Sequence, residues 1–187
     1  MMRIVAGTFR GRRLQAPKGR EIRPTSDRVR EAVFSILGTA VVGVRVLDLF
    51  AGTGALGLEA LSRGALQAVF ADQSAHAVQL IRFNIELCGV QDRVRVVHAP
   101  VDQALRRLAG RGETFDVVFM DPPYGEGSVQ KTLSGLRDVV PNGALVVAEH
   151  GVTDLSSLSL VEPEWSRIEE RKYGDTVVSF FVRELAH

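Results

Sequence analysis

The sequence has little of what builds disulfide-stapled, metal-bound or membrane-spanning proteins. Cys88 is the single cysteine among 187 residues, which excludes an internal disulfide and a cysteine-rich metal site. The four histidines, His76, His98, His150 and His187, show no close metal-ligand spacing. No apolar run approaches the ~20 residues of a membrane span, and the amino end lacks the apolar core of a signal peptide. We therefore expect a cytoplasmic protein without a metal or a membrane anchor.

The composition is otherwise that of an ordinary globular protein, with 45% hydrophobic and 24% charged residues. This length suits one well-buried core and is short for two. The net charge is only +1, but the charged residues are distributed unevenly along the chain. Residues 1–44 carry nine Lys or Arg against three acids, whereas residues 45–187 carry fourteen against nineteen. A basic arm on an acidic body indicates a polyanion-binding face beside a body that does not itself attract polyanions.

Strand-like and helix-like patterns alternate from residue 44 onward. Apolar runs predict strands at 45–50, 67–72, 94–98, 115–121 and 144–149, and helical periodicity predicts helices near 55–63, 75–88, 101–109 and 128–139. This alternation favours an α/β fold, a parallel sheet with helices on both faces. Near the end, the runs 167–172 and 176–182 flank Tyr173-Gly174-Asp175, which predicts a closing antiparallel hairpin.

The basic residues cluster before and within the first predicted helix. Residues 3–14 alternate and turn at Gly7 and Gly11, which indicates a short hairpin, and a helix is expected from Ser26. We divide the chain into a basic extension at 1–25, outside the α/β core, and a catalytic domain at 26–187. The candidate contacts to a nucleic-acid backbone are Arg10, Arg12, Arg13, Lys18, Arg20, Arg23, Arg28 and Arg30. The alternative is a solvated basic surface with no ligand.

A glycine-rich turn follows the first predicted strand. Gly52, Gly54 and Gly57 satisfy G-x-G-x-x-G between a strand and a helix, and Asp72 ends the next strand. This pattern indicates an adenosine-binding site, whose acid accepts hydrogen bonds from ribose hydroxyls. Nicotinamide dinucleotides and S-adenosylmethionine share this geometry. Asp48, four positions before Gly52, would repel a pyrophosphate but attract an ammonium group, which favours S-adenosylmethionine. We expect Asp48 and Asp72 to serve the cofactor and not the fold.

The stretch Asp121-Pro122-Pro123-Tyr124 directly follows a predicted buried strand, where open α/β sheets bind ligands. The two prolines fix the backbone and aim their carbonyl groups. A carboxylate and a carbonyl can each accept one hydrogen of an amino group while the tyrosine stacks on its ring. Because an aspartate of ordinary pKa is a weak base, we assign Asp121 mainly to orientation. An ordinary turn between a strand and a loop is the alternative.

Together these motifs resemble class I S-adenosylmethionine-dependent methyltransferases, with the D-P-P-Y motif of enzymes that methylate exocyclic amino groups. The amino-terminal stretches 2–7, 11–14 and 17–19, residues 23–25 with 27–32, and the terminal stretch 173–176 are similar to the bacterial 16S rRNA guanine-N(2)-methyltransferases. The resemblance covers nearly the whole chain and implies a seven-stranded Rossmann-like sheet and methylation of a guanine in small-subunit RNA. Binding to the small ribosomal subunit or an assembly intermediate, as a monomer, is expected.

The resemblance also implies a set of site residues. The expected catalytic residues are Asp121, Pro122, Pro123 and Tyr124. The expected cofactor-binding residues are Asp48, Phe50, Gly52, Thr53, Gly54, Asp72, Gln73, Pro100, Val101 and Asp121. One departure is His98-Ala99-Pro100-Val101, where relatives often place Asp or Asn to meet the adenine amino group. Here we expect adenine recognition to rest on the Val101 backbone and apolar packing.

Three other functions share some of these features. A DNA adenine amino-methyltransferase would share every core motif, so the basic amino-terminal segment carries the narrower assignment. A nicotinamide-dependent dehydrogenase would share the glycine turn, but Asp48 and the lack of an obvious hydride-transfer acid-base pair oppose it. A non-catalytic RNA-binding or assembly protein could have kept the fold.

Overall fold

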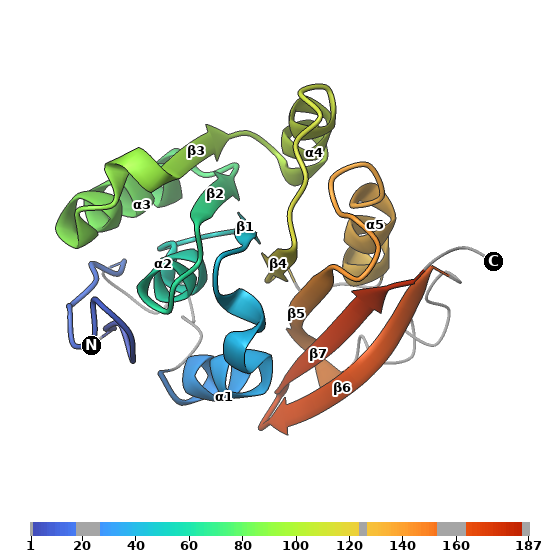
Figure 1. The fold of residues 1–187 in the computed structure, drawn as a ribbon, viewed down its shortest axis with the longest axis horizontal. Coiled ribbons are helices and arrows are strands. Elements are labelled where there is room, and N and C mark those ends of the chain that lie inside the picture. Colours follow the sequence, from blue (N-terminus) through green and yellow to red (C-terminus); the bar gives the residue numbers. More distant parts are fainter. Residues whose placement is uncertain (1, 18–26, 124–126, 153–163, 185–187) are drawn as a thin grey trace.

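A seven-stranded sheet forms the centre of the molecule (Figure 1). The computed structural model describes residues 2–17, 27–123, 127–152 and 164–184. In chain order the strands are β1 Arg45–Leu49, β2 Gln67–Asp72, β3 Val94–His98, β4 Val117–Met120, β5 Leu145–Gly151, β6 Trp165–Tyr173 and β7 Thr176–Arg183. Their order in the sheet is β3-β2-β1-β4-β5-β7-β6. The first five are parallel, and β7 pairs antiparallel with β5 and with β6. The predicted fold class and closing hairpin are confirmed.

The order of the strands reverses between β1 and β4. From β1 the chain adds β2 and β3 on one side and then crosses to β4 on the other. Where strand order reverses in this way, the connections leave the sheet in opposite directions and open a crevice beyond the carboxyl ends of the strands. All four residues of β4 are buried, as expected for a strand covered on both faces.

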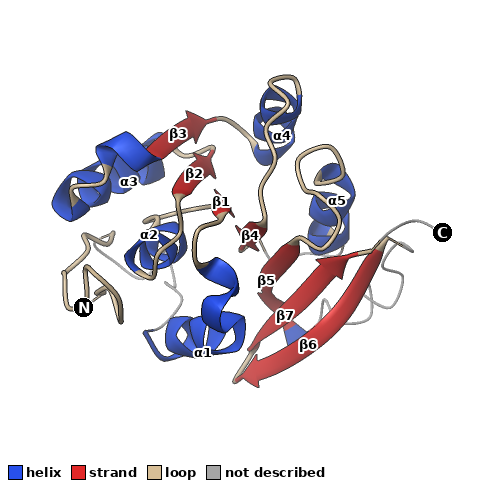
Figure 2. Ribbon diagram, in the orientation of Figure 1, coloured by secondary structure: helices blue, strands red, loops and turns tan. Residues whose placement is uncertain are grey.

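Helices cover both faces of the sheet (Figure 2). They are α1 Asp27–Leu37, α2 Ala55–Ser62, α3 Ala75–Cys88, α4 Val101–Ala109 and α5 Ser128–Gly135, with 3₁₀ turns η1 Gly38–Val41 and η2 Gln91–Arg93. Side chains of α1, α2 and α3 build one hydrophobic core against the sheet, and side chains of α4 and α5 build a second on the opposite face. None of the described helices has the length and apolar composition needed to cross a membrane.

Helix α5 ends four residues before the predicted position 139. Gly135 is its last residue, and the Leu136 N–H then bonds to the Leu133 carbonyl at 3.1 Å. That bond spans three residues instead of four, so the helix tightens and stops. Gly135 contributes to this ending because glycine is a weak helix former.

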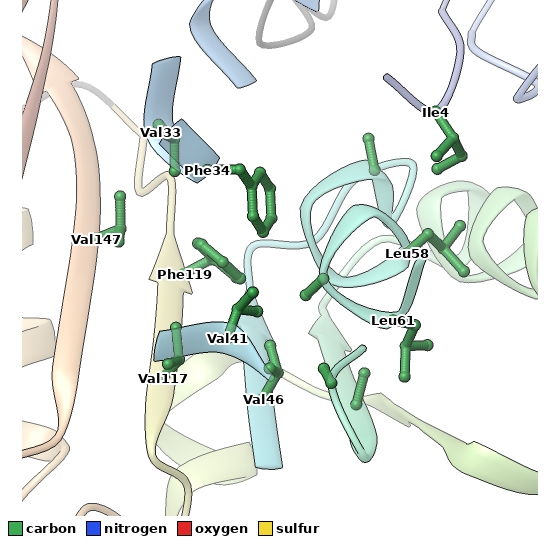
Figure 3. Close-up of a cluster of buried hydrophobic side chains, with 14 of the residues drawn as sticks. Ile4, Val33, Phe34, Val41, Val46, Leu58, Leu61, Val117, Phe119 and Val147 are labelled. Carbon is green, nitrogen blue, oxygen red and sulfur yellow. The ribbon is translucent and has the colours of Figure 1, made fainter. Parts of the chain in front are cut away.

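The first core joins the sheet, α1, α2 and residues 2–17, here called the amino-terminal segment (Figure 3). Phe34 of α1 meets Phe119 of β4 with ring centroids 5.4 Å apart at an interplanar angle of 50°. Ile4 is fully buried in the same core as Leu58 and Leu61 of α2. Burial of one such aliphatic side chain is worth roughly 1.5–3 kcal/mol. The segment that carries Ile4 is therefore part of the folded core.

The expectation that residues 1–25 lie outside the α/β core is thus wrong for part of this range. Met2, Ile4 and Leu14 are all buried in the first core. Residues 3–14 do turn back on themselves, since Arg3 and Arg13 form an antiparallel bridge. This confirms a hairpin-like path, although the bridge is isolated and no strand forms there. A division into an RNA-binding extension and a catalytic domain stays a prediction.

Candidate active site

The glycine turn between β1 and α2 has a backbone that few residues can adopt. Phe50, Gly52 and Gly54 have φ values of 55°, 56° and 75°. Phe50 is the one non-glycine residue with positive φ among the described residues, and such strain tends to be kept at functional sites. Packing also requires glycine at 57, where an added Cβ would lie 2.3 Å from the Phe70 ring. Glycines at these positions therefore allow the turn to adopt this backbone and α2 to pack close to the sheet.

Asp72, at the end of β2, fixes the turn from the neighbouring strand. Its Oδ2 accepts a hydrogen bond from the Gly52 N–H at 2.9 Å, and its Oδ1 accepts one from the Ser74 N–H at 2.8 Å. Each carboxylate oxygen has a second acceptor position, and the residue is partly exposed. Asp72 can therefore brace the turn and still accept from a ligand hydroxyl.

Asp48, near the end of β1, is almost fully buried. Its Oδ2 accepts a hydrogen bond from the Gly57 N–H in the first turn of α2 at 2.9 Å. Burial raises the pKa of Asp48 to about 8, and the nearby carboxylates of Asp72 and Asp121 add to this rise, while the Gly57 hydrogen bond opposes it. We expected Asp48 and Asp72 to serve the cofactor and not the fold. The second half is wrong, because Asp72 holds the turn and Asp48 holds the start of α2, and their role toward the cofactor stays a prediction.

Asp121 directly follows β4, which lies between β1 and β5 in the sheet. Met120 pairs with Leu49 of β1 on one side and with Ala148 of β5 on the other. Burial raises the pKa of Asp121 to about 7, and the carboxylate of Glu149 in β5 adds to the rise. An ordinary low pKa was expected, so the structure corrects this point: Asp121 is a better base than an exposed aspartate.

The remaining D-P-P-Y residues differ in exposure. Pro122 is buried and Pro123 is exposed, so the backbone after Asp121 is stiff and partly enclosed. Tyr124 lies outside the described residues.

The third group of expected cofactor residues lies at the end of β3. His98 pairs in register with Asp72, and its Nε2 lies 3.1 Å from the Gln73 carbonyl oxygen. Pro100 caps the start of α4, where its carbonyl accepts from the Ala104 N–H at 2.9 Å. Val101 packs on the second core. The expected cofactor residues therefore come from the carboxyl ends of β1, β2, β3 and β4, at one edge of the sheet.

Thr53 does not present its hydroxyl to this edge. The side chain is buried, and its Oγ1 lies 3.3 Å from the Met2 sulfur. Its carbonyl accepts from the Asn84 amide at 2.9 Å. With both groups engaged by the protein, Thr53 retains only its backbone N–H for a ligand.

The expected RNA-contacting arginines fall into two groups. Arg10, Arg13 and Arg28 are exposed. Arg12 is exposed too, but its Nη1 donates to the Leu87 carbonyl at 2.6 Å and its guanidinium lies 5.6 Å from the Phe9 ring centroid. Arg30 was expected to contact RNA, and the structure contradicts this because its side chain is buried. Lys18, Arg20 and Arg23 lie outside the described residues.

Arg30 is fully buried in the fold. Its Nη2 donates to the Arg3 carbonyl at 2.5 Å and to Asp27 Oδ1 at 2.7 Å. It lies off the apolar stripe of α1, as its spacing indicated, but the amino-terminal segment covers that side of the helix. A guanidinium in this position braces the segment and does not reach RNA.

Two polar residues that the sequence reasoning missed hold the amino-terminal segment, one from α2 and one from α3. Glu59 of α2 is fully buried, and its two oxygens accept from the Val5 and Ala6 N–H groups at 2.7 and 2.9 Å. Asn84 of α3 exchanges hydrogen bonds with the Gln15 backbone at 2.7 and 3.0 Å while its amide also reaches Thr53. The sequence offered one signal of the Glu59 contact: Glu59 is a lone acid in the apolar helix 55–62. A buried charge of this kind needs a partner from elsewhere in the fold.

Comparison with known proteins places the chain in a family. The sequence profile of the family described as "Conserved hypothetical protein 95" matches residues 2–182. The chain belongs to this family. It is 36% identical to the Ribosomal RNA small subunit methyltransferase D of Escherichia coli (strain K12) over 185 residues, 98% of this chain and 90% of that protein. The family resemblance expected from the motifs is confirmed.

Two further similarities span almost the whole of both chains. YlbH of Bacillus subtilis (strain 168) is 36% identical over 184 residues, 96% of this chain and 98% of that protein. The solved structure of yhhF from Escherichia coli has a TM-score of 0.85 at 36% identity and covers 98% of each chain. This protein and yhhF therefore share the same fold over nearly their whole length. Within the described part of this member, no group of three or more His, Cys, Asp or Glu could hold a metal ion.

Proposed function

We propose that this protein transfers a methyl group from S-adenosylmethionine to 16S rRNA, and specifically to the 2-amino group of a guanine. The relative from Escherichia coli, named as a small-subunit rRNA methyltransferase, supports the coarser statement. The observation that carries the proposal is the position of Asp121, at the end of β4, next to the glycine turn at the end of β1. A carboxylate beside an adenosine-binding turn suits transfer to an amino group.

The residues at this edge fit S-adenosylmethionine. An added Cβ at Gly52 would meet only the Phe50 carbonyl oxygen, at 3.9 Å, so the turn leaves open space where a ligand could approach the backbone. Asp72 has acceptor positions for ribose hydroxyls. Asp48 accepts one hydrogen bond, from the Gly57 N–H, among the described residues, and a ligand ammonium would stabilise its ionised form. S-adenosylmethionine supplies the electrophilic methyl group.

The chain's own task is to make a poor nucleophile react. The lone pair of a guanine amino nitrogen is delocalised into the ring. If the Asp121 carboxylate and the Pro122 carbonyl each accept one amino hydrogen, the nitrogen is biased toward a tetrahedral shape with its lone pair facing the methyl group. Such positioning and fixed electrostatics supply much of the rate in reactions of this kind.

The proton that must leave the methylated nitrogen has a natural acceptor. With its pKa raised to about 7, Asp121 is ionised in an appreciable fraction near neutral pH and holds a proton more strongly than an ordinary aspartate does. Asp121 therefore combines orientation of the amino group with removal of its proton. Tyr124 is proposed to stack on the base, which has left its own stack at a cost of a few kcal/mol.

The direct test uses small subunits and 16S rRNA from a strain that lacks the protein. Labelled methyl groups from S-adenosylmethionine should enter 16S rRNA, and mass mapping should locate them on the 2-amino group of one guanine. Comparison of free rRNA with assembled subunits identifies the substrate particle. Incorporation into duplex DNA instead of rRNA would favour the adenine amino-methyltransferase, and binding of NAD without S-adenosylmethionine would refute the cofactor assignment.

Two variants at Tyr124 test the stacking role. Tyr124→Phe keeps an aromatic face and should keep most of the activity. Tyr124→Ala removes stacking worth ~1–3 kcal/mol per base and should be much slower. Equal single-turnover rates of the two variants would show that stacking is not the function of this side chain.

A further inference from the structure

A basic hollow lies between β3, the edge strand of the sheet, and α4. It measures about 220 Å³ and is lined by Arg95, Val96, Val97, His98, Arg107, Leu108 and Arg111. This is several times the ~30 Å³ that one water molecule occupies in the liquid, so a phosphate group fits with part of its hydration shell. The lining contains three arginines and no acid.

The fold places these arginines together. β3 is an edge strand of the sheet, and alternate side chains of a strand share one face. Val97 packs with Leu108 of α4 in the second core, so Arg95, two residues earlier, faces the same side. Arg107 lies in the last turn of α4 and Arg111 follows the helix by two residues. Two elements therefore bring guanidinium groups to one hollow.

The charge of this cluster is not balanced by the acid beside it. Glu113 Oε2 lies 2.7 Å from Arg95 Nη2 and 3.2 Å from Arg45 Nη2, so one carboxylate serves two arginines. The guanidiniums of Arg107 and Arg111 have no ion-pair or hydrogen-bond partner among the described residues. By contrast, Arg106, next to Arg107, is paired with Asp102 at 2.9 Å. Unpaired arginines around a hollow in an otherwise acidic body point to an anionic ligand.

We propose that this hollow is a second phosphate-binding site for the RNA substrate, separate from the amino-terminal segment. The proposal rests on the proposed function. The segment packs on the core of α1, α2 and α3, whereas the hollow faces α4, so the two basic surfaces flank the β3 edge from opposite sides of the sheet. His98 at the rim also contacts Gln73, beside Asp72. RNA leaving the site could thus pass this edge and place a backbone phosphate among the arginines, which bind phosphate well.

The test is the salt dependence of RNA binding by an Arg107→Ala/Arg111→Ala double variant. Loss of two phosphate contacts to a single strand should reduce the log-log slope of affinity against salt by about 1.4, because each contact contributes about 0.7. Affinity at low salt should fall by roughly tenfold, on the scale of a charge-assisted hydrogen bond. Both side chains are exposed, so the melting temperature and the affinity for S-adenosylhomocysteine should not change. If the double variant is unstable, each single variant should show about half of the slope change.

Arg106→Ala is the matched control, because it removes the same charge from the same helix but from a side chain already paired with Asp102. It should alter the slope much less than the double variant. A double variant with the slope and affinity of the wild type, in a wild-type protein that binds and methylates rRNA, would overturn this site alone. A wild-type protein that does not bind rRNA would overturn the proposed function and this site with it.

Discussion

Asp121 carries the chemistry of the proposed reaction in a single carboxylate. Asp121→Asn keeps the shape but offers an amide whose N–H₂ end can face the substrate amine. The single-turnover rate with saturating cofactor should then fall by on the order of 10²-fold or more, as for the loss of one preorganised electrostatic contact. RNA affinity should hardly change. An Asp121→Asn enzyme at the wild-type rate would show that the carboxylate is not needed.

The raised pKa of Asp121 predicts a pH-dependent rate. Only the ionised form can take up the amino proton and attract the amino hydrogen with a full negative charge, so the rate should rise with pH through about 7 and then level off. Glu149→Gln removes the neighbouring negative charge that helps to raise the pKa. In that variant the inflection should move to lower pH while the plateau stays similar. A carboxylate with a raised pKa titrates between about pH 5 and 8. A pH–rate profile with no inflection in that range would show that the reaction does not need the ionised form of Asp121.

Asp48 predicts a pH-dependent stability of the ligand-free protein. Its pKa is about 8 in the fold against an ordinary value of 3.8, so between these pH values the folded state binds a proton that the unfolded state has released. The free energy of unfolding should therefore fall as pH rises through this window. Urea unfolding at several pH values checks this. Asp48→Asn cannot titrate and should flatten the fall, and an unchanged pH dependence in that variant would assign the effect to other groups.

Among the elements, the amino-terminal segment is both a structural part and a candidate RNA surface. Ile4→Ala should lower the free energy of unfolding by ~2–5 kcal/mol, because it leaves a cavity against α2. Arg10→Ala, on the exposed side of the same segment, should change it by less than ~0.5 kcal/mol. Equal stability of the two variants, measured by urea unfolding, would show that the segment is not part of the core. Removal of residues 1–22 is accordingly not a clean test of RNA binding.

The exposed arginines of this segment give a cleaner test. Arg10→Ala/Arg13→Ala should weaken binding to 16S rRNA and reduce its salt slope, by about 0.7 for each lost contact to a single strand, while leaving cofactor affinity and stability unchanged. Arg12 is less suitable because it also bonds to the Leu87 carbonyl. Salt-independent binding by the wild-type protein would rule out a backbone contact.

At the scale of the whole molecule, charge and topology act together. Residues 1–44 hold the basic excess and residues 45–187 the acidic excess, yet the fold joins both parts in one core. Asp48, Asp72 and Asp121 lie at or beside the carboxyl ends of β1, β2 and β4, which are neighbours in the sheet. Because parallel strands end at one edge, three acids far apart in the sequence meet beside the glycine turn. Burial, with repulsion from Asp72 and Asp121, raises the pKa of Asp48, and a site for a cationic cofactor can use such a buried acid.

The sequence by itself determined the local structure and the positions of the site residues at the ends of successive strands. Strands β2 and β3 and helices α3 and α4 have the predicted bounds, since each shows a strong period of its own and clear ends. The glycine turn and the acids at strand ends were visible because a motif of a few residues carries them. Their meeting at one edge followed from the parallel alternation alone.

Only the tertiary structure decided which polar side chains are buried and what they hold. Arg30 lies off the apolar stripe of its helix, but a segment 27 residues away covers it. Glu59 bonds to backbone groups 54 and 53 residues away, and the pKa of Asp121 depends on Glu149 of another strand. Helical spacing shows only the direction in which a side chain leaves its own element. Burial, and the hydrogen bonds and pKa values that follow from it, depend on distant segments that pack against it, and no local pattern records them.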